Sequence, residues 1–394
     1  MSVAEGDEVI VLHPAFCASC QQPVDGDAPQ PQRHHVCDLP PMCPVVTESP
    51  WHRVSCPGGG EATHAAWPAG VPSGMGGPRA HAMASRCPGA SRLSQRTTQR
   101  LLDDLCGVQG RVGTLSQLEA TTTAAVASPV EEARSFVQEQ SSAHRDETGG
   151  RAGGQRAWLG VAATMGGTVC VVRLSRGGQV ARDLVGEACG GILVTDRWSA
   201  SHGYPVRWRH RCWAPRRRDS AAMMERGGGS QESGEALQRQ APQLLHGWHR
   251  VRDGPRSRSS FRSSMRPVRR EVARLLEAGS TCGVPKTAGL CRDILTLRQA
   301  LWPCVPLAGV EPTHNPAERA LRPGVWWRKG RCGTHSAQGS RFVASMMTVV
   351  ATLKQQQRNI LEYLTTACEA ALHDAPAPSL LPVSLVAPSD QGAA

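Results

Sequence analysis

A single carboxylate surrounded by cations stands out in the stretch Val310–Lys329. Asn315 is a good helix N-cap, Pro316 suits the first helical position, and Glu318 then occupies the third. We expect this helix to be short, because Pro323 cannot continue it. The side chains around Glu318 are hydrogen-bond donors and cations, namely Thr313, Arg319, Arg322, Arg328 and Lys329.

Two interpretations of Glu318 are open. In the first, Glu318 only closes a capping box and accepts a hydrogen bond from the backbone N–H of Asn315. In the second, it is a ligand of a divalent cation. Hydrolysis and transesterification of phosphodiesters use two such cations about 4 Å apart, and hard cations take several oxygen ligands. The second interpretation therefore requires further carboxylates from distant parts of the chain.

The sequence from Val310 to about Leu364 closely resembles the C-terminal part of insertion-sequence-66 family transposases. The resemblance is carried by Arg319–Lys329, R-A-L-R-P-G-V-W-W-R-K, and by the long segment that follows. In that family the motif N-x-x-E-R holds the last carboxylate of an Asp-Asp-Glu metal triad on a ribonuclease-H-like fold. The resemblance implies that Glu318 is this carboxylate and that two aspartates lie upstream.

Two upstream segments resemble the aspartate segments of the family. One is D-E-T-G at Asp146, and the other is V-T-D-R-W-S-A-S around Asp196. The resemblance implies that Asp146, Asp196 and Glu318 are catalytic and bind Mg²⁺ or Mn²⁺. Taken singly, Asp146 has the alternative of a turn residue, and Asp196 that of a cap at the end of a strand.

The residues around these aspartates predict an α/β fold class. Ala157–Ala163 and Thr168–Leu174 have the composition of two strands joined by a glycine turn. Gln179–Val185 has a helical pattern, and the apolar run Gly191–Thr195 is typical of a strand buried on both faces. This order, with Asp196 at the tip of the buried strand, is the one that a ribonuclease-H-like catalytic core requires. We assign that core to residues 136–364.

Three residues depart from the family pattern. Arg145 replaces an apolar neighbour of the first aspartate, and Gly150 stands where a tryptophan is usual. Pro215 replaces the histidine of C-W-A-H, where a proline in a helix interior would cost about 3 kcal/mol. Arg145 and Pro215, together with Gly59 at a zinc-ligand position of the family, motivate an alternative function, a catalytically decayed remnant that binds DNA without cutting it.

A helical, arginine-rich insert is expected at residues 207–305. Arg207–Arg218 contains six arginines, and Arg250–Arg274 contains nine arginines against two acids. With a formal net charge of +11, this density favours a surface that faces DNA phosphates over a merely solvated one. Pro267–Ala278 can form a helix with one basic face. The expected DNA contacts are Arg197, Arg216, Arg217, Arg218, Arg269, Arg270, Arg319, Arg322, Arg328 and Lys329.

Residues 1–86 resemble a degenerate zinc-ribbon-like segment of the family. Cys17 and Cys20 have the spacing with which two thiolates grip one zinc ion, and Cys56 begins a second pair. The fourth ligand position is Gly59, and the side chains that could substitute for it are His34, His35, Cys37 and His52. Zn²⁺ binding by Cys17, Cys20 and Cys56 therefore competes with the alternative of unligated thiols.

Residues 87–135 are predicted to be helical. Leu101, Leu102 and Leu105 form an apolar stripe, and Val112–Leu118 is a second short helix. Together they could form a helix-turn-helix or a plain helical hairpin. We expect a linker at Thr121–Ala127 and then another helix, Val130–Gln138.

The chain is expected to end in two helices and a disordered tail. The helices are Ser340–Gln357 and Asn359–Leu372, and the tail begins at Ala375, within residues 365–394. Fifteen scattered cysteines and an acidic start without a leader predict a reduced, cytoplasmic protein with no membrane partner, associated with the nucleoid when bound to DNA. The resemblance implies double-stranded DNA as partner, a homo-oligomer on DNA and accessory transposition proteins.

Overall fold

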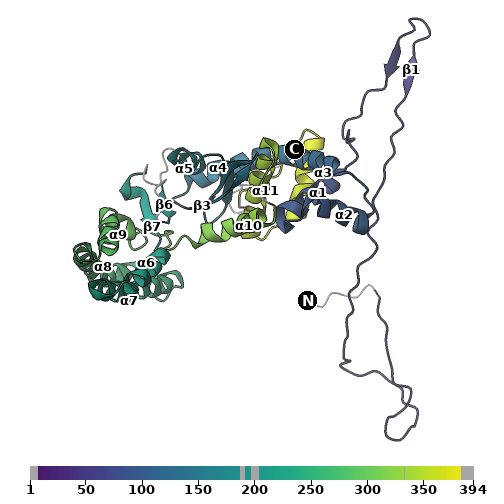
Figure 1. Ribbon diagram of the computed structural model, residues 1–394. Coiled ribbons are helices and arrows are strands. Elements are labelled where there is room, and N and C mark those ends of the chain that lie inside the picture. The colour runs from purple at the N-terminus through teal and green to yellow at the C-terminus, as the bar shows by residue number, and fades with distance from the viewer. Residues whose placement is uncertain (1–7, 187–190, 197–203, 332, 383–394) are drawn as a thin grey trace, which may run out of the picture.

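The computed structural model describes residues 8–186, 191–196, 204–331 and 333–382. A central sheet with helices on both faces forms the body, a helical lobe extends from one end, and extended N-terminal segments leave the other (Figure 1). In the described part of the chain, no helix is both long and apolar enough to cross a membrane.

The central sheet has five strands in the order β5-β4-β3-β6-β7. Strand β4 pairs antiparallel with β5 on one side and with β3 on the other. Strand β6 runs parallel to β3, and β7 runs parallel to β6. The predicted strand pair and the buried strand are confirmed. The strands are β3 (Ser142–Ala152), β4 (Gln155–Ala163), β5 (Thr168–Arg173), β6 (Ile192–Thr195) and β7 (Arg209–Arg211).

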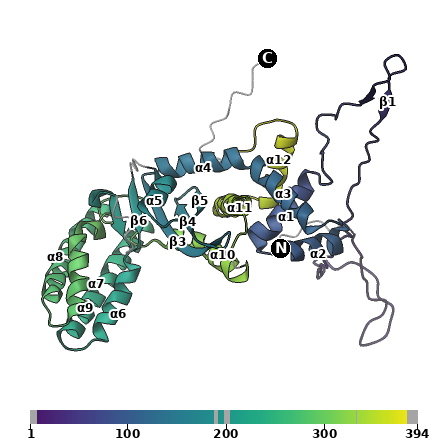
Figure 2. The same ribbon diagram turned by 45° about the horizontal axis from the view of Figure 1, so that its top comes forward.

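Helices pack against both faces and one edge of the sheet. Helix α10 (Asn315–Arg331) lies on one face, and α4 (Ala127–Glu139) and α5 (Gly178–Val185) lie on the other (Figure 2). Helix α11 (Ala337–Gln355) lies along the edge strand β5 and accepts hydrogen bonds from its backbone. The approach of α10 is close, because a Cβ added at Gly324 would overlap a methyl group of Leu159 in β4. The helix predicted at Gln179–Val185 is confirmed as α5.

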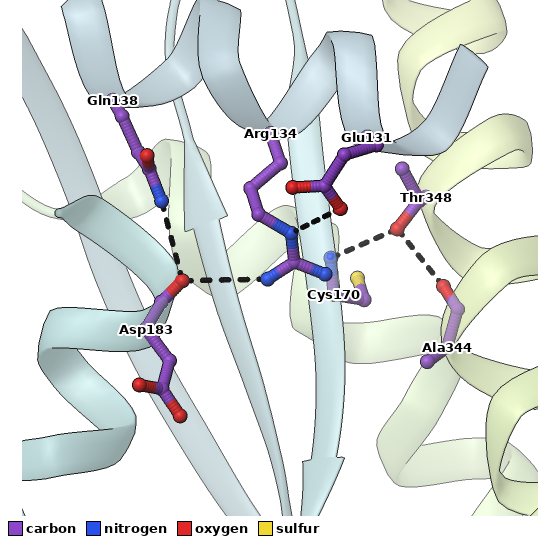
Figure 3. A network of polar contacts seen from close by, with 7 residues as sticks. All are labelled: Glu131, Arg134, Gln138, Cys170, Asp183, Ala344 and Thr348. Carbon is purple, nitrogen blue, oxygen red and sulfur yellow. Dashed lines mark hydrogen bonds and ion pairs between the residues drawn. The ribbon is translucent and has the colours of Figure 1, made fainter. Parts of the chain in front are cut away.

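Polar side chains tie α4 and α11 to their neighbours (Figure 3). Thr348 in α11 accepts a 2.9 Å hydrogen bond from the backbone N–H of Cys170 in β5 and donates one to the carbonyl of Ala344. From α4, Arg134 and Gln138 both donate to the carbonyl of Asp183 in α5, at 3.3 Å each. Backbone groups at the sheet edge and at the end of α5 are thereby satisfied.

The helical lobe is the predicted insert. It consists of α6 (Ala214–Met224), α7 (Gly228–Arg252), α8 (Arg258–Ser280) and α9 (Pro285–Thr296). Its core is continuous with the sheet, because Phe261 and Val268 belong to the same buried cluster as Ile192 and Val194 of β6. Two short 3₁₀ turns, Val206–Trp208 and Arg298–Leu301, flank the lobe.

The N-terminal region combines a small hairpin with three helices. Strands β1 (Arg53–Ser55) and β2 (Ala62–His64) pair antiparallel at the end of an extended arm (Figure 1). The helices are α1 (Pro78–Ser91), α2 (Gln95–Cys106) and α3 (Val112–Ala125). Helix α1 crosses the boundary that we placed after residue 86. The predicted linker Thr121–Ala127 is wrong, because only Val126 separates α3 from α4.

The C-terminal helix α12 (Ile360–Leu372) lies within one residue of the prediction, and Asn359 is its N-cap, with a side chain that accepts from the backbone N–H groups of Leu361 and Glu362. The tail prediction is wrong for residues 375–382. Leu380 is buried, and its N–H donates to the carboxylate of Glu132 in α4 at 3.1 Å. Residues 383–394 lie outside the described part.

Prolines mark helix boundaries less strictly than predicted. Helix α10 continues through Pro323 to Arg331, and α8 starts at Arg258, well before Pro267. Packing explains this result, because each helix buries apolar side chains on both sides of its proline, which offsets the lost hydrogen bond. Pro215 lies in the first turn of α6, where a missing N–H loses no bond, so it does not break a helix interior.

Candidate active site

Asp146 and Asp196 lie side by side at neighbouring parallel strands. The last pair in the β3–β6 register is His144 with Val194, and each aspartate follows its partner by two residues. Opposed residues of parallel strands point to the same face, so both carboxylates project to one side of the sheet. Burial raises the pKa of Asp146 to about 6, and the negative charge of Asp196 adds to this effect.

Glu318 reaches the same place from the first turn of α10. Its Oε1 lies 3.2 Å from Nε2 of His314, and that nitrogen lies 3.9 Å from Oδ2 of Asp146. The charge of Glu318 also adds to the effect of burial in raising the pKa of Cys212, beside β7, to about 11. The Cys212 sulfur accepts hydrogen bonds from the backbone N–H groups of His314 and Ala214. The structure thus brings Asp146, Asp196 and Glu318 together.

The capping-box interpretation of Glu318 is wrong. The backbone N–H of Glu318 donates to the carbonyl of His314 at 3.2 Å, so His314 holds the N-cap position that we assigned to Asn315. The third helical residue is then Ala317, which is fully buried. Glu318 has no capping task to perform, and its carboxylate contacts the His314 imidazole.

Three buried histidines accompany the carboxylates and were missed by the sequence analysis. His314 is 4% exposed at its side chain, and His144 and His210 lie in the same row across β3, β6 and β7. Burial lowers the pKa of His144 to about 3 and that of His210 to about 4, so both are neutral at pH 7. A usable signal was present, because His144 precedes Asp146 by two residues in a strand and His314 precedes Glu318 by one helical turn.

Arg145 does not enter the carboxylate cluster. It projects to the opposite face of β3, where its Nη2 lies 2.8 Å from a carboxylate oxygen of Glu147. Glu147 also pairs with Arg176, at 2.9 Å. The arginine that replaces an apolar residue is therefore buried and neutralised away from the site.

The predicted DNA-contacting cations fall into four groups. Arg216 is buried beside Asp219 at 3.3 Å, so the prediction that it contacts DNA is wrong. Arg328 is half-buried and donates to the Thr148 hydroxyl and to the carbonyl of Gly149, which fixes α10 to β3. Arg197 lies outside the described residues. The remaining predicted contacts are exposed: Arg217, Arg218, Arg269, Arg270, Arg319, Arg322 and Lys329.

The zinc-ligand candidates are not assembled. Backbone N–H groups of Cys20 and Ser19 lower the pKa of Cys17, and those of Gly59 and Gly58 lower that of Cys56, as in loops that present a thiolate. Cys17 and Cys20 share a turn in the segment that precedes β1. That segment and the β1–β2 arm extend to different sides of the body (Figure 1). Across the described ranges, no group of three or more His, Cys, Asp or Glu side chains is placed to hold a metal ion.

The carboxylate cluster nevertheless suits hard cations in its chemistry. Asp146, Asp196 and Glu318 offer oxygen donors, which Mg²⁺ and Mn²⁺ prefer. The raised pKa of Asp146 reports a buried site that disfavours an isolated negative charge, and a divalent cation would compensate that charge.

Comparison with known proteins shows the family of the chain. A family model described as the IS66 family of transposases matches residues 79–341, from α1 to the beginning of α11. A search of curated proteins found no match.

Proposed function

Because the chain belongs to the IS66 family of transposases, we propose that it cuts and joins DNA at Asp146, Asp196 and Glu318. The observation that carries this proposal is the convergence of acids from three distant segments. Asp146 of β3 and Glu318 of α10 both lie near Nε2 of His314, and Asp196 follows β6, which runs parallel beside β3. The proposed reaction is hydrolysis of a phosphodiester at the end of the mobile element. The freed 3′-hydroxyl then attacks target DNA, without a covalent protein intermediate.

The proposed core is ribonuclease-H-like. Support comes from a sheet of three antiparallel strands continued by two parallel ones, with the first aspartate on the central strand and the second beside it. The helical insert lies between the second aspartate and the glutamate, as the sequence order predicted.

Mg²⁺ or Mn²⁺ would be held by the oxygens of Asp146, Asp196 and Glu318, and when bound would activate the attacking oxygen and stabilise the leaving one. The residues around these ligands have separate tasks. His314 fixes the position of Glu318, and the neutral, buried His144 lies two residues before Asp146 in β3. The exposed Arg319, Arg322 and Lys329 of α10 attract the DNA backbone next to the carboxylates.

Of the three residues that motivate the alternative of a decayed, DNA-binding remnant, Arg145 and Pro215 have ordinary places in the fold, whereas Gly59 still stands at the fourth zinc-ligand position. Arg145 is neutralised by Glu147 on the far face of β3, and Pro215 starts a helix instead of interrupting one. Double-stranded DNA, a homo-oligomer and accessory proteins remain the proposed partners. Zinc binding by Cys17, Cys20 and Cys56 stays a prediction.

The test is metal-dependent nicking of the element's terminal-repeat DNA by Glu318→Gln. We expect the variant to fold and to bind DNA, because Gln preserves shape and hydrogen bonding, but to lose cleavage, because a cation ligand loses its charge. Asp196→Asn should behave alike, and the double variant should be no worse than either. Glu232→Gln, an exposed change in α7, is the matched control. Nicking by Glu318→Gln at the control rate would reject the site, and an inactive parent chain would restore the remnant alternative.

A further inference from the structure

Helix α8 presents a row of arginines to solvent. Arg262, Arg266, Arg269 and Arg270 are all exposed, at intervals of four, three and one residue. Residues spaced in this way share one side of a helix. The buried side of α8 is apolar and packs into the lobe through Phe261, Met265, Val268 and Val272. Packing therefore fixes the helix, and the arginines contribute nothing to the core.

These four arginines lack acidic partners. Arg274, on the same helix, pairs with Glu271 at 2.7 Å, and Arg258 donates to three backbone carbonyls. By contrast, no carboxylate of the described ranges lies within ion-pair distance, 4.0 Å, of Arg262, Arg266, Arg269 or Arg270. Four unpaired positive charges along little more than two helical turns repel one another, by about 0.2–0.5 kcal/mol for each i, i+4 pair.

The spacing of the row fits a polyphosphate backbone. Arg262 and Arg270 are eight residues apart, so the row is about 12 Å long. Over that length, one strand of duplex DNA presents three to four phosphates, roughly one every 3.4 Å. Guanidinium groups bind phosphate oxygens in bidentate fashion, which a rigid row on one helix face can do at several phosphates at once.

We propose that the Arg262–Arg270 face of α8 binds the backbone of duplex DNA away from the position that is cut. Helix α8 lies on the outer side of the lobe, separate from β3 and α10 (Figure 2). DNA held at the carboxylates must therefore extend over the lobe to reach this face. The inference rests on the proposed function for the path of the DNA. The contacts between the α8 arginines and the DNA backbone do not involve the carboxylates.

The experiment compares two charge-matched double variants of the full chain. Arg266→Gln/Arg270→Gln removes two unpaired arginines, and Arg252→Gln/Arg274→Gln removes two exposed arginines of the same lobe that pair with Asp253 and Glu271. Affinity is measured between 50 and 200 mM salt, on a duplex long enough to cross the lobe and on one that ends beside the cleavage position.

On the long duplex, we expect the first variant to reduce the magnitude of the slope of log affinity against log salt by about 1.8, because each of the two lost phosphate contacts contributes about 0.9. The control and the charge-preserving Arg266→Lys/Arg270→Lys should keep nearly the parent slope. On the short duplex, all variants should bind and nick like the parent. Equal slopes for the first variant and the control would overturn the proposal.

Two further outcomes are decisive. If Arg266→Gln/Arg270→Gln melts at a lower temperature than the parent, Arg262→Gln/Arg269→Gln tests the same face through its other two members. If Arg266→Gln/Arg270→Gln shows the expected slope change relative to the parent, but the parent never nicks DNA, the proposed function fails and the α8 surface stands.

Discussion

His314 Nε2 lies 3.2 Å from Glu318 Oε1, across the first turn of α10. The imidazole is buried, and the same nitrogen lies 3.9 Å from Oδ2 of Asp146, so His314 limits the positions that the Glu318 carboxylate can take. We expect His314→Ala to weaken Mn²⁺ binding and DNA nicking by about 10- to 100-fold, the usual effect of removing a group that orients a metal ligand. Calorimetric titration with Mn²⁺ and the nicking assay check this, with the exposed His249→Ala as control. Equal Mn²⁺ affinities for the two variants would show that His314 is only structural.

The raised pKa of Asp146 predicts a stability that falls with pH. Between about pH 4 and pH 6, the folded protein holds a proton that the unfolded chain has released, because the pKa rises from 3.8 to about 6 on folding. Above this window the ionised carboxyl lowers the free energy of unfolding by up to about 3 kcal/mol. In EDTA, Asp146→Asn should therefore melt higher than the parent near pH 8, with little difference near pH 4. The same melting temperature for both proteins near pH 8 would contradict the assignment.

Gly324 allows α10 to approach β4. An added Cβ would overlap a methyl group of Leu159, and it would lie 2.9 Å from the Cε of Met347. We expect Gly324→Ala to lower the free energy of unfolding by about 1–3 kcal/mol, as overpacking usually does. Gly330→Ala, in the same helix but with open space around it, should be neutral or stabilising by up to about 1 kcal/mol. Denaturant unfolding of both variants measures the difference, and a stabilising Gly324→Ala would show that the contact relaxes freely.

Thr348 satisfies a backbone donor at the edge of the sheet. Thr348→Val keeps the shape of the side chain but leaves the Cys170 N–H buried without an acceptor, which should cost about 1–3 kcal/mol. Thr366→Val in α12 removes an exposed hydroxyl bonded only within its own helix, and should have a small effect. Thermal melting separates the two. Similar losses for both variants would mean that the strand-edge bond has no special weight.

Sequence periodicity found the elements whose burial is uniform. The apolar run before Asp196 became β6, and the stripe through Phe342 and Met346 became α11. Strand β3 was hidden because its polar residues are paired by partners from elsewhere, as Glu147 is by Arg176. Such pairing depends on tertiary contacts, which local patterns do not contain.

Arginine density wrongly predicted an exposed surface where the arginines lie in a strand. Arg209 and Arg211 were counted in a phosphate-facing surface, yet both are buried in β7. The same density correctly indicated the exposed α8 row, because a helix with a clear apolar stripe leaves its other face to solvent. The three carboxylates followed from family resemblance, whereas His314, which lies between two of them, did not.

The position of the lobe in the chain affects when the site can exist. Asp146 and Asp196 are synthesised long before Glu318, and the hydrogen bond from His314 to Cys212 spans 102 residues. The helices α6 to α9 lie within that interval, and contacts between residues so far apart in the chain carry a loop-closure cost that slows their formation. A nascent chain, or a fragment that ends within the lobe, would carry both aspartates without the third acid. On the proposed chemistry, such an incomplete chain could not cut DNA, so the order of the three acids along the chain delays activity until α10 has been made.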